Sequence, residues 1–107
     1  MRNIEIKKWT EQDREGNKVE ADTLKLLNSL VGMKKPEEIP RGIDKFRLFG
    51  RLAKAFDKAE KSGVLTLEEL EYSFLKKTIE TDIFGPWAMN PKILEAVELF
   101  MDAEEVK

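Results

Sequence analysis

Apolar residues in four stretches of this chain lie three or four positions apart, the spacing that lines one face of an α-helix. In the longest stretch, the residues that follow this spacing are Ile43, Phe46, Phe49, Leu52, Ala53, Phe56 and Ala59. Helices of this kind bury their apolar faces against one another, so they must share a core. The pattern predicts helices over residues 22–33, 43–61, 66–81 and 90–104.

Residues that are typical of helix starts support these bounds. Asp22 can cap the first helix, and Asn90 followed by a proline is a common start for the last one. Thr66 and Glu69 have the spacing of a capping box, in which the two side chains bond reciprocally to backbone N–H groups. We therefore predict that the third helix begins at Thr66.

The N-terminal residues alternate between apolar and polar, which is the pattern of a strand with one buried face. Ile4 and Ile6 lie on one side of this strand, and Gly16 with Asn17 favours a turn. The residues that follow the turn can return beside the first strand, so we predict a β-hairpin within residues 1–21. A hairpin alone is barely stable, so it must pack on the helices.

A chain of 107 residues can form one core and has no room for a second. We therefore predict a single domain over residues 1–107, of the α+β class and mostly helical, with a short N-terminal β-hairpin and about four helices around one core. No stretch has the long apolar run that spans a bilayer, and the charged start does not fit a signal peptide. With the absence of cysteine, these features lead us to expect a cytoplasmic protein.

Cysteine and histidine are both absent from the sequence. Their absence excludes disulfides, thiolate metal sites and every nucleophile that needs a histidine base. Catalysis by two carboxylates in a cleft stays open, but no motif points to it. We therefore expect a protein that is not an enzyme, with no catalytic residues, cofactor, metal or small-molecule substrate.

Residues 57–68 have part of the spacing of an EF-hand calcium loop, with Asp57 at the first position and Glu68 at the twelfth. Ala59 and Lys61 stand where oxygen ligands belong, and a lysine repels the ion. We therefore interpret this segment as a corner between two helices.

Charged residues form two separate rows. Five cations on the second helix follow at spacings of three and four and form a basic ridge of Arg47, Arg51, Lys54, Lys58 and Lys61. Carboxylates repeat in the same way at the end of the chain and form an acidic ridge of Glu95, Glu98, Asp102 and Glu105. The net charge of the chain is −2, yet residues 34–61 carry +4 and residues 66–107 carry −6.

Three interpretations of these ridges stay open. Both can be solvated helix faces, which is the ordinary role of charged residues on a helix. They can also dock a partner protein, or join copies of this chain head to tail, basic ridge to acidic ridge. In the third interpretation the basic ridge follows the phosphates of a nucleic acid. Against it, the next helix begins with three carboxylates, and no aromatic residues interleave with the cations.

Residues 83–89 are too apolar for a simple surface connection, and they include Phe84 and Trp87. These rings can form a plug that closes one end of the helical core. They can also form an exposed anchor for a partner protein, because aromatic residues dominate the hot spots of interfaces.

The order of these features resembles that of small accessory proteins encoded by tailed bacteriophages and prophages. The resemblance lies in the N-terminal Ile-x-Ile strand, in Trp87 ahead of the last helix, and in the segments Lys45–Leu52, Phe56–Ala59, Leu65–Glu69 and Phe74–Lys77. It implies a protein of the bacterial cytoplasm that binds other proteins, in virion assembly, in tail chaperoning or in interference with a host factor. It implies no catalytic residues.

From the sequence we therefore predict a non-enzymatic protein–protein interaction module that uses the two ridges and the Phe84–Trp87 loop. Its partner is another protein or a second copy of the chain. The alternative is a small regulatory protein that contacts nucleic acid through the basic ridge.

Overall fold

The computed structural model describes residues 1–12, 14–34, 37 and 41–105, so the other positions of the predicted domain lie outside the described residues. Along the chain the elements follow in the order β1 (Arg2–Glu5), β2 (Lys8–Gln12), β3 (Lys18–Asp22), α1 (Thr23–Gly32), α2 (Ile43–Ser62), β4 (Val64–Leu67), α3 (Glu69–Asp82), the 3-10 helix η2 (Gly85–Met89) and α4 (Pro91–Met101). The fold is α+β and mostly helical, which confirms the predicted fold class.

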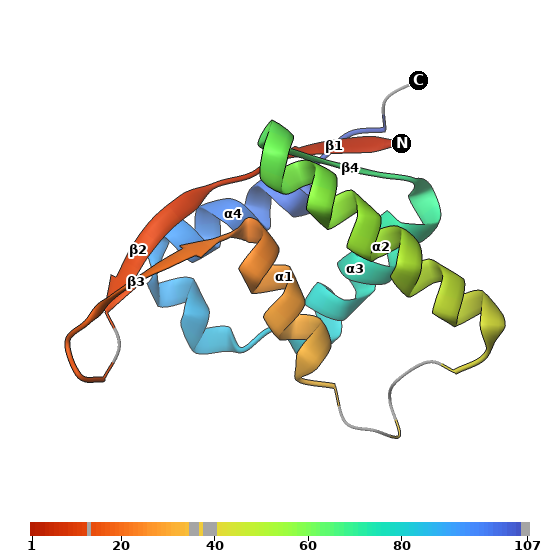
Figure 1. Cartoon of the computed structure of the whole chain (residues 1–107). Coiled ribbons are helices and arrows are strands. Elements are labelled where there is room, and N and C mark those ends of the chain that lie inside the picture. Colours follow the sequence, from red (N-terminus) through yellow and green to blue (C-terminus); the bar gives the residue numbers. More distant parts are fainter. Residues whose placement is uncertain (13, 35–36, 38–40, 106–107) are drawn as a thin grey trace.

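Figure 1 shows α2 in front of α3, with α1 beside α3, α4 behind them and the β2–β3 hairpin extending to one side. The strands form two separate antiparallel sheets of two strands each, β1 with β4 and β2 with β3. None of the helices in the described part of the chain combines the length and the apolarity that crossing a bilayer requires.

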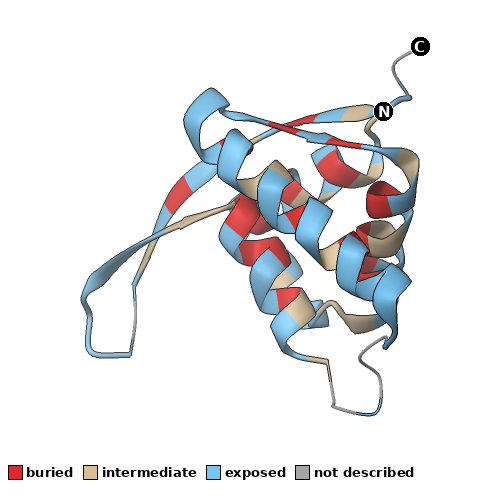
Figure 2. Cartoon of the chain, turned by 45° about the vertical axis from the view of Figure 1, so that its right-hand side comes forward, coloured by how far each residue is buried: buried red, intermediate tan, exposed pale blue. Residues whose placement is uncertain are grey.

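The buried residues form two neighbouring clusters. The larger one joins β1, β4 and all four α-helices, and its largest fully buried members include Tyr72 and Phe100. The smaller one gathers Trp9 of the hairpin and three residues of α1 and α4. Trp87 and Val97 pack against both clusters and so connect them. Figure 2 shows that the buried positions face inward, while most of the outer side of α2 is exposed.

The pairing of the first strand differs from the prediction. Ile4 belongs to β1, which pairs with β4 and not with the residues after the turn. The hairpin is formed by β2 and β3 instead. The chain passes from one sheet to the other at Lys7, whose N–H donates to Oγ1 of Thr23 at 3.0 Å and whose carbonyl accepts from the N–H of Thr23 at 3.1 Å. Pairing with β4 buries Ile4 in the larger cluster. A place in the hairpin would not bury it there, because the hairpin extends to one side of the molecule.

The start of the third helix was also predicted wrongly. Thr66 lies in β4, and α3 begins at Glu69 with no side-chain capping bond. The hydroxyl of Thr66 donates to Oδ1 of Asn3 at 2.8 Å, across the β1–β4 pair. Glu69 bonds to Arg2. The capping box is therefore absent, because contacts with β1 engage both side chains.

Three residues of the predicted apolar face of α2 are not part of the core. Ile43 and Phe46 are 60% and 74% exposed, and Ala53 is exposed as well. The buried positions of this helix are Leu48, Leu52 and Ala59. Figure 1 shows that the first turn of α2 extends past the other helices, so none of the described helices covers it there.

Candidate interaction surface

The basic ridge is an exposed face of α2. Helix geometry places its five cations on one side of the helix, and all five are exposed. Arg51 forms an ion pair in which Nε lies 2.5 Å from Oε1 of Glu71. Within the described part of the chain, no ion pair is recorded for the other four cations, Arg47, Lys54, Lys58 and Lys61. The face therefore presents four positive charges to the solvent.

Glu71 sets Arg51 apart from the rest of the ridge. The side chain of Glu71 is 5% exposed, whereas that of Arg51 is 46% exposed. The second carboxylate oxygen, Oε2, is buried and finds no hydrogen-bond partner among the described residues. A buried carboxylate that loses its cation is strongly destabilising. Arg51 thus compensates a buried charge and is the ridge residue that is least free to bind a partner.

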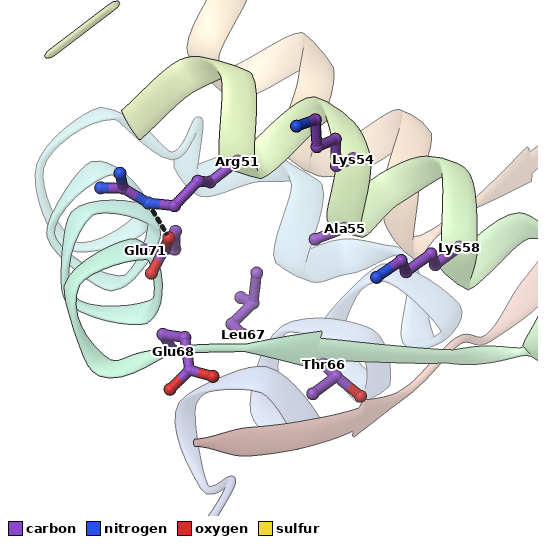
Figure 3. A pocket seen from close by; sticks show the side chains of 8 residues that line it. All are labelled: Arg51, Lys54, Ala55, Lys58, Thr66, Leu67, Glu68 and Glu71. Atoms are coloured by element: carbon purple, nitrogen blue, oxygen red, sulfur yellow. Dashed lines mark hydrogen bonds and ion pairs between the residues drawn. The ribbon is translucent and has the colours of Figure 1, made fainter. Parts of the chain in front are cut away.

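A groove of about 300 Å³ lies beside the ridge, between α2 on one side and β4 with the first turn of α3 on the other (Figure 3). Its lining residues are Arg51, Lys54, Ala55, Lys58, Thr66, Leu67, Glu68 and Glu71. No residue of β1 lines it, so the groove lies on the side of β4 that faces away from its partner strand. The small side chain of Ala55 leaves the middle of the α2 wall open.

The acidic ridge lies on the outer side of α4 and just beyond its end. Glu95, Glu98 and Asp102 are all exposed, and Oε1 of Glu95 lies 3.7 Å from Nζ of Lys7. Glu105 comes after the helix and forms a β-bridge with Arg2, so it departs from the predicted row. Because α4 lies behind α1 and α3 while α2 lies in front, the two ridges occupy different sides of the molecule (Figure 1).

The two aromatic residues of the Phe84–Trp87 loop lie in different surroundings, one packed on the core and one exposed. Trp87 is half-buried and packs against both core clusters, as expected of a plug. Phe84 is 54% exposed, and its ring centre lies 6.3 Å from that of Trp87 in an edge-to-face arrangement. Met89 at the end of η2 is 86% exposed. Within this loop, the large apolar side chains left exposed for a partner are therefore Phe84 and Met89.

The segment that resembles an EF-hand loop has another structure. Asp57 lies within α2, which continues to Ser62, and Glu68 follows directly after β4. A calcium loop needs an irregular backbone that wraps around the ion, and this segment is helical in its first half. Among the described residues, no group of three or more acidic side chains could hold a metal ion.

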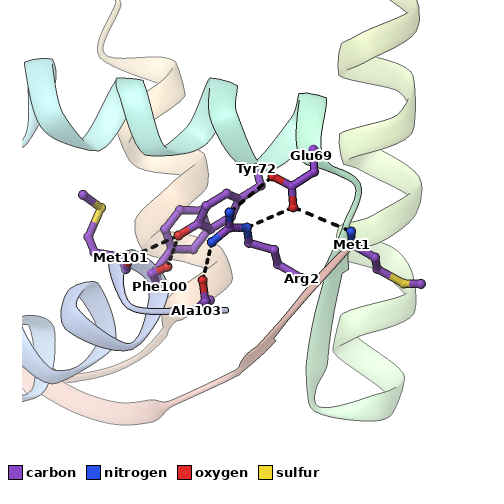
Figure 4. A network of polar contacts seen from close by, with 7 residues as sticks. All are labelled: Met1, Arg2, Glu69, Tyr72, Phe100, Met101 and Ala103. Atoms are coloured by element: carbon purple, nitrogen blue, oxygen red, sulfur yellow. Dashed lines mark hydrogen bonds and ion pairs between the residues drawn. The ribbon is translucent and has the colours of Figure 1, made fainter. Parts of the chain in front are cut away.

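A polar network around Arg2 joins the two ends of the chain to α3 (Figure 4). Nε of Arg2 donates to Oε1 of Glu69 at 3.0 Å, and Nη1 donates to the carbonyl of Ala103. The hydroxyl of Tyr72 donates to the carbonyl of Phe100 at 2.7 Å. No local sequence pattern reveals this network, because Arg2 is 67 residues from Glu69 and 101 from Ala103 along the chain.

The network shifts the ionisation of its members. The hydrogen bond from Arg2 holds the pKa of Glu69 below its ordinary value, and the same bond raises the pKa of Arg2. Burial raises the pKa of the Tyr72 phenol. These shifts favour the ion pair and the neutral phenol in the folded state, so the network stabilises the fold.

Comparisons with models of protein families, with curated proteins and with solved structures found no match.

Proposed function

We propose that this chain is a non-enzymatic protein that binds other proteins through the basic ridge of α2. The observation that carries the proposal is the set of four exposed cations for which no ion pair is recorded within the described residues. Like charges one turn apart on a helix repel each other, as Lys54 and Lys58 do. A complementary acidic surface relieves this repulsion and selects the partner by charge.

The setting of this role follows from the resemblance to phage accessory proteins. It suggests an assembly factor, a chaperone or a host-factor binder in the cytoplasm of a bacterial host. A second copy of the chain is one candidate partner, because the acidic and basic ridges lie on different sides of the molecule. Contacts between unlike surfaces join copies head to tail and form a ring or a filament.

Affinity capture from a bacterial lysate tests the proposal with two charge-reversal variants. Lys54→Glu with Lys61→Glu alters the ridge, whereas Lys77→Glu with Lys92→Glu makes the same change of charge on exposed positions of α3 and α4. We expect the ridge variant to lose partners that the native protein and the control retain. The same set of partners on all three proteins would contradict the proposal.

Light scattering on a sizing column, at low and at high salt, tests self-association. An oligomer that dissociates in salt supports ridge-to-ridge contact, because salt screens exposed charges. A mobility shift with DNA or RNA that disappears in the ridge variant would instead support the alternative role in nucleic-acid binding.

A further inference from the structure

We propose that the groove beside α2 receives an extended acidic segment of a partner protein, which adds as a strand to the outer edge of β4. This inference rests on the proposed protein-binding function and names the chemistry of the partner at that surface. It is carried by the outer edge of β4, by the cations across the groove, and by the match between their spacing and that of a strand.

One edge of β4 pairs with β1, and no strand in the described part of the chain pairs with the other edge. The N–H of Ile6 donates to the carbonyl of Gly63 at 3.0 Å, directly before β4. Along an antiparallel pair, the backbone groups point to the partner strand at every second residue. Leu65 and Leu67 therefore bond to β1 as Gly63 does, and Thr66 points its N–H and C=O away from β1, toward the groove.

The side chain of Thr66 agrees with this register. It bonds to Asn3, which lies directly opposite on β1. Close side-chain contact is typical of an opposed pair that exchanges no backbone hydrogen bonds. Outside the β1–β4 pairing, no recorded bond from a described residue uses the N–H or C=O of Thr66. An incoming strand can therefore bond to this residue, as in other cases of strand addition to a sheet edge.

Lys54 and Lys58 line the wall of the groove across from this edge. They lie one turn apart on α2, which corresponds to a rise of roughly 6 Å along the helix axis. Alternate residues on one face of an extended strand are about 6.7 Å apart. Two carboxylates separated by one residue in the partner segment therefore match the spacing of the two ammonium groups.

The other end of the groove has a different charge. Glu68 is exposed there, and Glu71 is engaged with Arg51. A partner carboxylate at this end would meet the charge of Glu68. We therefore expect the partner segment to carry two acidic residues, separated by one residue, opposite Lys54 and Lys58. We expect its residues beside Glu68 to be uncharged.

The charge match is tested with a fluorescein-labelled synthetic peptide in which glutamate and valine alternate, followed by uncharged residues. Its anisotropy is measured at physiological salt, where exposed charges more than about 8 Å apart are screened. We expect Lys54→Glu with Lys58→Glu to weaken binding by roughly tenfold. The control is Arg47→Glu with Lys61→Glu, which makes the same change of charge on the ridge but outside the groove lining. An equal loss in both variants would overturn the assignment to the groove.

Strand addition is tested without altering the protein. The same peptide with N-methyl groups on alternate residues keeps its charges but cannot donate backbone hydrogen bonds on that edge. Two such peptides are made, one methylated at the odd-numbered residues and one at the even-numbered residues. We expect the peptide whose methyl groups face β4 to bind roughly tenfold more weakly, and the other to bind nearly as well as the parent. The parent peptide should also slow hydrogen exchange of the Thr66 amide. Equal binding of both methylated peptides, with no protection of Thr66, would overturn strand addition.

These outcomes separate the inference from the proposed function. If the peptide fails to bind the native protein, the groove inference is wrong, while partners captured through the ridge would still support the proposed function. If single-stranded DNA of equal charge binds more tightly than the peptide and loses affinity in Lys54→Glu with Lys58→Glu, the groove accepts phosphates and the inference is overturned.

Discussion

The guanidinium carbon of Arg2 lies 4.3 Å from the centre of the Tyr72 ring. On its other face the same ring stacks on Phe100, with the ring centres 4.9 Å apart. One aromatic side chain of α3 thus connects the first strand of the fold with its last helix (Figure 4).

Tyr72 is the only tyrosine in the sequence, so the ultraviolet absorbance of phenolate reports on it alone. Burial raises the pKa of its phenol above 10.0, and the nearby positive charge of Arg2 only partly opposes this effect. The native state favours the neutral phenol, so its contribution to stability is complete below the unfolded pKa and is lost as the pH rises through the folded value. We expect the native protein to titrate at higher pH than the urea-unfolded chain; the reverse order would contradict the burial of Tyr72.

At acid pH the ion pair between Arg2 and Glu69 should control stability. The pKa of Glu69 is lowered, chiefly by its hydrogen bond to Arg2. Its contribution is therefore complete above the unfolded pKa and is lost as the pH falls through the folded pKa. We expect Glu69→Gln to lower the melting temperature at neutral pH and to have little effect at a pH low enough to protonate Glu69 in both the folded and the unfolded chain. Glu80→Gln, at an exposed position of the same helix, is the matched control. It should leave the melting temperature unchanged at both neutral and acid pH.

A second acid-sensitive pair joins the segment just after α1 to the end of α3. Nζ of Lys34 lies 2.8 Å from Oδ2 of Asp82, and this hydrogen bond lowers the pKa of Asp82. Asp82→Asn should therefore lower the melting temperature at neutral pH, with the difference disappearing toward acid pH. Thermal unfolding followed by circular dichroism at several pH values measures this, and a pH-independent difference would argue against the ion pair.

Removing Arg51 leaves the carboxylate of Glu71 buried without its cation. Because Arg51 is half-exposed, we expect Arg51→Met to lower the free energy of unfolding by about 1–3 kcal/mol, less than for a fully buried pair. Arg51→Met combined with Glu71→Leu should recover most of this loss, since no buried charge remains. Arg47→Met is the control, with an expected change within about 0.5 kcal/mol. Urea unfolding measures all three; equal losses for Arg51→Met and Arg47→Met would show that Glu71 does not depend on Arg51.

The partner of Thr66 distinguishes a capping box from a cross-strand pair. In double-mutant cycles with alanine, we expect Thr66 to show a coupling of roughly 0.5 kcal/mol with Asn3 and a smaller one with Glu69. A coupling that is larger with Glu69 would place Thr66 at the start of α3 and would also remove the strand edge on which the groove inference depends.

Local patterns in the sequence were sufficient for most helix bounds. The helix predicted over residues 43–61 is observed as Ile43–Ser62, and it ends at Gly63 with φ of 80°. Asn90 caps α4 by accepting from the N–H of Lys92 at 3.0 Å. Spacing and caps act within one or two turns of chain, so they need no knowledge of the rest of the fold.

The pairing of β1 could not be obtained in this way. Residues Arg2–Glu5 and Val64–Leu67 are far apart in sequence, and nothing local distinguishes that pairing from a hairpin with residues after the turn. Burial of Ile4 in the larger core decides between them. The same pairing moves Thr66 from a helix start into a strand, since its hydroxyl finds Asn3 across the sheet.

For the candidate surface, the sequence by itself determined that five cations share one face of a helix, because helical spacing fixes which residues lie together. Only the tertiary structure decided what each of them does. Arg51 meets Glu71 because α3 packs beside α2, and Lys54 and Lys58 line a groove with residues of β4 because β4 returns along α2. Charge and periodicity are local properties of a chain, whereas an ion partner or an open edge depends on which distant segments pack against each other.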